Sequence, residues 1–167
     1  VQLEKGRVEG VRRIDVLTAQ QMHDAVMAGV EGQHVFIGVA AVADWRVENA
    51  SEQKIKKTAD RALPTFTFVE NPDILASVAK LPHPPFAVGF AAESGDLEVH
   101  GEEKRVRKNV PLLIGNLGPL TFGLDDNEVI LFEAGGSTKL PRADKQTLAR
   151  ALIVEIARRL PDTSLIR

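Results

Sequence analysis

The stretch FIGVAAVADWRVENASEQKIKK, residues Phe36–Lys57, is the part of the sequence that decides the fold. It begins as an apolar run, becomes rich in glycine and alanine, and then reaches Asp44 and Trp45. A buried strand that loses its bulky side chains toward its carboxyl end leaves its backbone open to a ligand. The three lysines within Lys54–Lys57 have no apolar face to serve, so the stretch predicts a site for a polyanion and a divalent metal.

The composition predicts one globular domain over all 167 residues, with 44% hydrophobic and 26% charged content. A formal charge of -2 gives no overall attraction to nucleic acid or to an anionic membrane, so we expect neither partner. The absence of cysteine excludes disulfides, Cys-ligated zinc and a thiol nucleophile, and it suits the cytoplasm. The chain opens on Val1 in a linker-like segment, so we expect a fragment of a longer protein.

Apolar runs alternate with amphipathic stretches along the chain, which predicts an α/β fold: a three-layer sandwich around a mostly parallel sheet. The strands are expected at residues 12–17, 34–41, 63–69, 86–92, 110–115 and 128–132. Helices are expected to begin at residues 18 and 71 and to cover residues 101–109 and 143–160. In such a sheet, ligands bind at the carboxyl ends of the strands.

Local signals mark the helix starts. Thr18 and Gln21 form a capping box. Asn71 is the expected N-cap of the second helix, with Pro72 at its first position, and that helix start is a candidate anion site. Gly135–Lys139 is interpreted as a connector, because it precedes a proline and lacks the spacing of a phosphate loop.

Each candidate residue also has a purely structural interpretation. The lysines of Lys54–Lys57 could be a solvated charge run, and Asp44 could cap a turn instead of holding a metal or a sugar hydroxyl. Capping alone would explain Asp73. Phe90 could be a core residue, and Glu93 could be a surface charge.

Lys104 and Lys108 lie four residues apart, so in a helix they share one face. They could pair with the neighbouring Glu102 and Glu103. Two cations on one helix face also suit a triphosphate.

Five motifs occur together in register, and together they resemble bacterial phosphopantothenoylcysteine synthetase, the carboxyl-terminal half of the bifunctional coenzyme A biosynthesis flavoprotein. The motifs are AAVADWR (Ala40–Arg46), KIKK (Lys54–Lys57), NPDIL (Asn71–Leu75), VGFAAES (Val88–Ser94) and KRVRKN (Lys104–Asn109). The resemblance runs from about residue 11 to residue 160 and implies a Rossmann-like fold.

The activity that the resemblance implies is the joining of 4'-phosphopantothenate to L-cysteine, with CTP consumed to CMP and pyrophosphate. The substrate carboxylate would attack the α-phosphate of CTP, and the cysteine amine would then attack the acyl-cytidylate. Such a reaction needs cations and Mg²⁺ more than a nucleophile.

The resemblance also implies which residues form the site. The CTP site would consist of Gly38, Val39, Ala40, Asp44, Lys54, Pro72, Asp73, Ile74, Leu75, Phe90, Lys104 and Lys108. Catalysis would involve Lys54, Lys57, Ala40 and Ala41, and the metal would bind Asp44.

Two parts of the resembled family are missing from the sequence. One is an upstream Gly/Ser-rich nucleotide loop with an Asn that turns over the acyl-cytidylate, so weak or no ligation is expected from this chain alone. The other is the flavin-dependent decarboxylase half, so no FMN is expected, although that half could be a partner.

The family is dimeric, which suggests a homodimer paired through a β-rich arm at residues 110–132. Two alternative functions remain open at this point. One is a catalytically incomplete nucleotide-binding and dimerisation module. The other is a generic Rossmann domain for nucleotides or nucleotide sugars, although the sequence lacks the glycine fingerprint of such domains.

Overall fold

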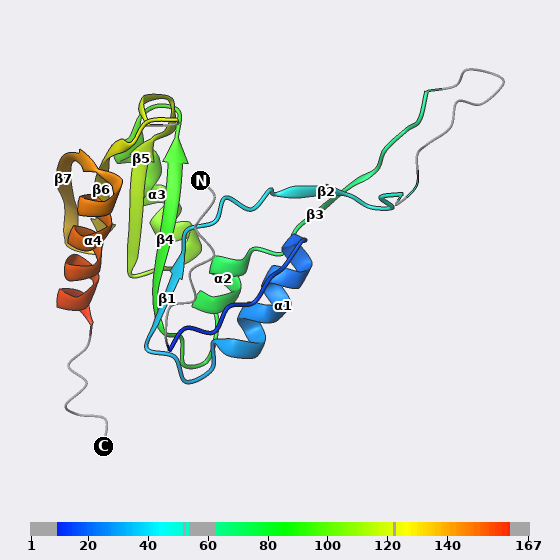
Figure 1. Ribbon diagram of the computed structural model, residues 1–167, viewed down its shortest axis with the longest axis horizontal. Coiled ribbons are helices and arrows are strands. Elements are labelled where there is room, and N and C mark those ends of the chain that lie inside the picture. The colour runs from blue at the N-terminus through cyan, green and yellow to red at the C-terminus, as the bar shows by residue number, and fades with distance from the viewer. Residues whose placement is uncertain (1–9, 52, 54–62, 122, 161–167) are drawn as a thin grey trace.

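The computed structural model describes residues 10–51, 53, 63–121 and 123–160, which form a sheet with helices on both faces and a projecting ribbon (Figure 1). The elements are, in chain order, α1 (Ala19–Gly29), β1 (Val35–Gly38), β2 (Trp45–Val47), β3 (Phe68–Glu70), α2 (Ile74–Ala79), β4 (Phe86–Glu93), α3 (Leu97–Lys108), β5 (Leu112–Leu117), η1 (Gly118–Leu120), β6 (Asp126–Glu133), β7 (Gly136–Asp144) and α4 (Lys145–Arg159).

The main sheet has the order β1-β4-β5-β6-β7. β1, β4 and β5 are parallel, because the crossovers through α2 and α3 return the chain to the same end of the sheet. β6 and β7 are antiparallel to their neighbours and form a hairpin around Ala134 and Gly135. The sheet is therefore mixed, and the prediction of a mostly parallel sheet is right for one half of it.

Side chains of the central strands alternate between two cores. Val88 and Leu112 belong to the core that packs under α4, on one face of the sheet. Ala87 and Leu113 belong to the core that packs against α2 and α3 on the other face. This alternation confirms the predicted three layers.

The secondary structure predicted for residues 12–17 and 135–139 differs from the structure. Residues 12–17 form no strand in the described structure, and Val11, Ile14 and Leu17 are exposed, because no described strand lies beside them. The predicted connector Gly135–Lys139 instead turns into β7, an edge strand that the sequence analysis missed.

A two-stranded ribbon of β2 and β3 extends away from the sheet (Figure 1). Its antiparallel register joins Trp45 to Glu70 and Val47 to Phe68. The arm predicted at residues 110–132 is wrong, because those residues contribute β5 and β6 to the sheet and Leu112 is fully buried. The projecting β-structure is formed instead by Trp45–Val47 and Phe68–Glu70, in the first half of the chain.

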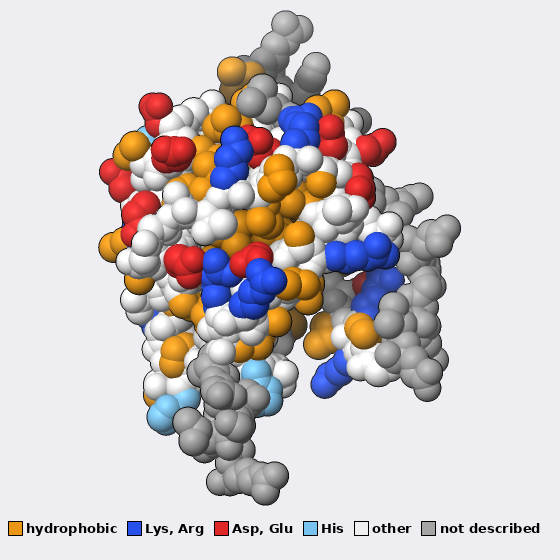
Figure 2. Space-filling view, turned by 90° about the vertical axis from the view of Figure 1, so that its left-hand side faces the viewer, with side chains coloured by type: hydrophobic (Ala, Val, Ile, Leu, Met, Phe, Trp, Pro, Cys, Tyr) orange, Lys and Arg blue, Asp and Glu red, His pale blue; other side chains and the backbone are white. Residues whose placement is uncertain are grey.

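The surface carries mixed charge. Figure 2 shows the side of the molecule where β7 and α4 lie, with basic and acidic side chains standing beside one another around a strip of hydrophobic ones. Within the described ranges, no helix is both long and apolar enough to cross a bilayer.

Candidate functional site

The carboxyl ends of β1 and β4 form one side of the candidate site. Gly38, the last residue of β1, pairs with Gly89 of β4. A Cβ on Gly89 would lie 2.5 Å from Leu75 Cδ2, so this glycine makes room for α2 and not for a ligand. Beyond β1, Ala40 and Ala41 are exposed, which leaves the main chain accessible there as predicted.

Hydrogen bonds hold the segment after β1 beside the segment that enters α2. The backbone N–H of Asn71 donates to the Asp44 carbonyl at 2.8 Å, and Asn71 Nδ2 donates to the Ala43 carbonyl at 2.8 Å. Arg46 Nη1 donates to Asn71 Oδ1 at 3.2 Å and to the Glu70 carbonyl at 2.5 Å. The AAVADWR and NPDIL motifs therefore meet in space.

Asp73, and not Asn71, caps α2. Its Oδ1 accepts the Ala76 N–H at 3.0 Å, while the Asn71 side chain is engaged with the segment after β1. The predicted N-cap is thus wrong, and Pro72 precedes the cap. α2 has six residues and its start already holds a carboxylate, so its N-terminus is a weaker anion site than expected.

The two lysines of α3 point toward this region. Lys104 Nζ lies 3.1 Å from Glu93 Oε1, at the end of β4, and Lys108 Nζ forms an ion pair with Asp73 Oδ2. Their side chains are 31% and 22% exposed. The predicted shared helix face is confirmed, since both lysines contact carboxylates from elements that pack against α3.

Glu102 forms no ion pair with Lys104 or Lys108. It binds Arg105 on the same helix at 2.7 Å, so the alternative pairing with Glu102 is wrong. Burial raises the pKa of the Asp73 carboxyl, but the bonds from Lys108 and the Ala76 N–H outweigh it, and the net shift of the pKa is downward. Asp73 is therefore ionised at neutral pH.

Other predicted residues lie around this centre. Ile74 and Leu75 open α2, and Val39 is exposed just beyond β1. Phe90 packs against the core under α4, on the opposite face of the sheet from Leu75. Its side chain therefore has the core role that the sequence analysis kept as an alternative.

The predictions for Lys54 and Lys57 lie outside the described residues. Among the residues that the structure does describe, no group of three or more acidic or histidine side chains could hold a metal by itself. A single carboxylate such as Asp44 remains compatible with Mg²⁺, because this ion is commonly held by one or two carboxylates together with phosphate oxygens and water.

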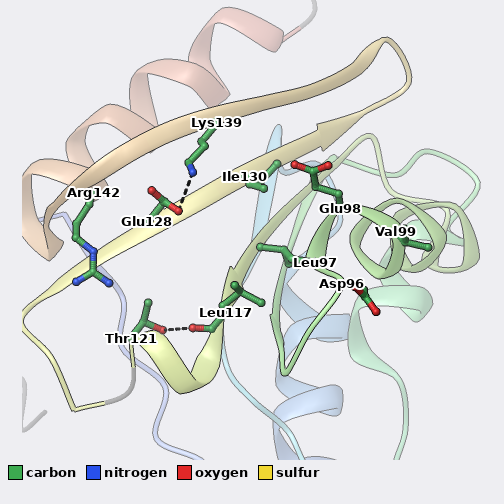
Figure 3. Close-up of a pocket in the computed structure, with 10 residues that line it drawn as sticks. All are labelled: Asp96, Leu97, Glu98, Val99, Leu117, Thr121, Glu128, Ile130, Lys139 and Arg142. Atoms are coloured by element: carbon green, nitrogen blue, oxygen red, sulfur yellow. Dashed lines mark hydrogen bonds and ion pairs between the residues drawn. The ribbon is translucent and has the colours of Figure 1, made fainter.

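A separate cavity of about 430 Å³ lies between the start of α3 and the β6–β7 hairpin (Figure 3). Leu97, Leu117 and Ile130 contribute apolar lining, and Lys139 pairs with Glu128 at its side (Figure 3). None of the motif residues lines it. We therefore place the candidate site at the α2, α3 and β4 junction, where the four motifs that the structure describes converge.

Sequence reasoning underestimated two residues of this junction. Glu93 was considered as a surface charge, but it pairs with Lys104 and is 20% exposed. Arg46 was seen only as part of a motif, but it ties the ribbon to the segment before α2. Both contacts join residues that are far apart in the sequence, so they cannot be predicted from residue spacing.

Comparison with known proteins places the chain clearly. The profile of the family described as "DNA/pantothenate metabolism flavoprotein C-terminal domain" matches residues 1–160. The "Coenzyme A biosynthesis bifunctional protein CoaBC" of Vibrio cholerae is 44% identical over 148 residues, covering 86% of this chain and 37% of that protein. The protein of the same name from Escherichia coli K12 is 44% identical over 154 residues, covering 89% of this chain and 38% of that protein. The chain thus spans less than two fifths of the length of these relatives.

Among solved structures, the chain is similar to the C-terminal domain of a coenzyme A biosynthesis bifunctional protein CoaBC, with a TM-score of 0.69 and 25% identity. The match covers 87% of this chain and 64% of that one. The similarity includes the α/β architecture described above.

Proposed function

Because the chain belongs to the family of the DNA/pantothenate metabolism flavoprotein C-terminal domain, we propose that it carries the CTP-binding core of a phosphopantothenoylcysteine synthetase. The proposed reaction joins 4'-phosphopantothenate to L-cysteine and belongs to coenzyme A biosynthesis. We place it in the cytoplasm.

One observation carries the proposal. Lys104 and Lys108 project from one face of α3 toward the end of β4 and the start of α2. The segment after β1 is tied to the same place through Asn71. Cations from a helix, exposed main chain after a strand and a nearby acid together supply what a nucleoside triphosphate needs.

The proposed chemistry explains the abundance of cations. A carboxylate oxygen of 4'-phosphopantothenate attacks the α-phosphorus of CTP, and the bond to the bridging oxygen breaks so that pyrophosphate leaves. The amine of cysteine then attacks the acyl carbon of the acyl-cytidylate, and CMP leaves. Negative charge develops on phosphate oxygens in the first step, so fixed cations lower its barrier.

The residues of the chain take different parts in this proposal. Lys104 and Lys108 bind phosphates, and the exposed main chain at Ala40 and Ala41 lies against the acyl intermediate. Lys54 and Lys57 act on the reacting phosphate. Asp44 would hold Mg²⁺, which supplies further charge neutralisation when bound.

The most direct test measures CMP release. Release that requires both 4'-phosphopantothenate and L-cysteine would support the ligase, whereas CMP release without either substrate would contradict it. Because the chain spans less than two fifths of the length of the relatives it matches, the assay should be run on the chain alone and on a full-length relative. The chain alone is expected to bind CTP but to ligate weakly.

Calorimetry separates nucleotide binding from turnover. Lys104→Ala and Lys108→Ala should each weaken CTP binding about tenfold, because each removes a charge-assisted phosphate contact. Lys139→Ala is the matched control, since Lys139 lies on β7 in an ion pair with Glu128. A preference for NAD over CTP would instead favour a generic Rossmann domain.

A second candidate function is a dimerisation module. Trp45 and Phe68 on the ribbon are 57% and 61% exposed, and large exposed aromatic side chains often mark a protein interface. We propose that two copies of the chain associate through this ribbon. Sedimentation that depends on concentration and is lost in a Trp45→Ser, Phe68→Ser variant would support the association, and a monomer at all concentrations would contradict it.

A further inference from the structure

The two lysines assigned to phosphate both form ion pairs with carboxylates. Lys104 is held by Glu93 and Lys108 by Asp73, and these carboxylates come from two different elements, β4 and the start of α2. The lysines are one helical turn apart, so their ammonium groups leave the helix in the same direction. The protein therefore presents two cation–carboxylate pairs where a polyphosphate would bind.

The two pairs differ in burial, since the Asp73 side chain is 43% exposed whereas both partners of the other pair are largely buried. Glu93 and Lys104 are 20% and 31% exposed, so both partners have lost most of their contact with solvent. The Asp73 carboxylate also caps α2 through Ala76, which fixes its position whether or not Lys108 is present. Carboxylates fixed in this way keep the lysine side chains extended toward the site.

On the premise of the function proposed above, we infer that Glu93 and Asp73 are positioning residues that stand in for two phosphate groups until the nucleotide displaces them. Each carboxylate opposes binding in two ways. The triphosphate must break the existing pair, and the released carboxylate then faces a polyanion of the same sign. Removing the charge while keeping the shape should therefore strengthen nucleotide binding.

Glu93→Gln and Asp73→Asn make that change. Asparagine caps helices about as well as aspartate, so Asp73→Asn keeps the start of α2 intact. Calorimetric titration with CTP and Mg²⁺ should show dissociation constants about threefold to tenfold lower than for the unmodified protein. The control is Glu102→Gln, which removes the same charge from α3 where the partner is Arg105.

A purely structural role makes the opposite prediction. If these pairs only fasten α3, the substitutions lower both stability and nucleotide affinity. If the carboxylates stand in for phosphates, stability falls while affinity rises. Urea unfolding of the same variants reports stability independently, so the two measurements separate the roles.

Titrating the variants with tripolyphosphate tests the inference about the carboxylates without depending on which nucleotide the protein binds. Failure of the unmodified protein to bind CTP would overturn the proposed function. Tighter tripolyphosphate binding by Glu93→Gln and Asp73→Asn than by the unmodified protein would still support the inference. Equal or weaker binding of tripolyphosphate by both variants, or an equal gain in Glu102→Gln, would overturn it.

Discussion

The body of the molecule and the β2–β3 ribbon hold their residues in place by different means. In the body, α3 packs so closely on the sheet that Gly101 touches the ring of Phe132, and both residues are buried. The ribbon has backbone pairing between two short strands, with Trp45 and Phe68 exposed. Burial fixes the first region, whereas hydrogen bonds fix the second.

This difference bears on Lys104 and Lys108, the two lysines of α3. Lys104 and Lys108 belong to the packed body, so their positions do not depend on a ligand. Lys54 and Lys57 fall, in the sequence, between the two strands of the ribbon.

The largest expected contrast is in stability. Leu113→Ala removes a fully buried side chain of β5 and should lower the free energy of unfolding by about 3 kcal/mol. Phe68→Ala in the ribbon should lower it by less than about 0.5 kcal/mol, because that side chain is already exposed. Urea denaturation measures both, and similar losses for the two variants would break the distinction between body and ribbon.

The central parallel strands of the body are the part that the sequence predicted well. The runs around Phe86–Glu93 and Leu112–Leu117 are apolar on both faces, and this pattern is dictated by burial between two helical layers. The capping box at Thr18 was predictable because it is local. Both signals can be read within a short stretch of sequence, so they did not require knowledge of distant partners.

Long-range contacts account for what could not be predicted. The interpretation of residues 63–69 as a strand was right only near its end, since β3 depends on finding β2 as its partner. Asn71 was misassigned because its side chain bonds to Ala43, which lies far back in the chain. The shared face of Lys104 and Lys108 was predictable from spacing, but their carboxylate partners were not.

A smaller contrast tests how tightly α3 is held. A Cβ on Gly101 would lie 2.3 Å from Phe132, so Gly101→Ala should cost about 2 kcal/mol of unfolding free energy even after the gain in helix propensity. Gly95→Ala is the matched control, because a Cβ there meets nothing within 4 Å. Equal urea midpoints for the two variants would mean that α3 is not closely packed.

A pH-dependent contrast is expected at the far end of the body, where Arg159 joins α4 to β6. Its guanidinium binds Glu133 at 2.8 Å and Glu155 at 2.7 Å, and these bonds lower the pKa of both carboxyls. Their stabilising effect is complete above the ordinary glutamate pKa of about 4.3 and is lost as the pH falls through the lower folded-state value.

Arg159→Met should therefore lower the thermal midpoint at pH 7 by less than Gly101→Ala does, and the difference from the unmodified protein should vanish at strongly acidic pH. Arg150→Met, at an exposed position on the same helix, is the control for lost charge. A difference that persists unchanged into strong acid would show that Arg159 contributes through packing alone.

The smallest expected effect concerns the ribbon itself. Arg46→Met removes the bonds to Asn71 and to the Glu70 carbonyl, and since the ribbon adds little to the core, the free energy of unfolding should change by less than about 0.5 kcal/mol. The local effect should still be visible by hydrogen exchange.

The Glu48 N–H, which donates to the Thr67 carbonyl within the ribbon, should exchange faster in the variant, while amides of β4 and β5 keep their rates. Arg13→Met, which breaks an exposed pair with Asp15, is the matched control. Faster exchange in β4 as well would mean that ribbon and body open together, because local opening of a ribbon held only by hydrogen bonds leaves the buried strands closed.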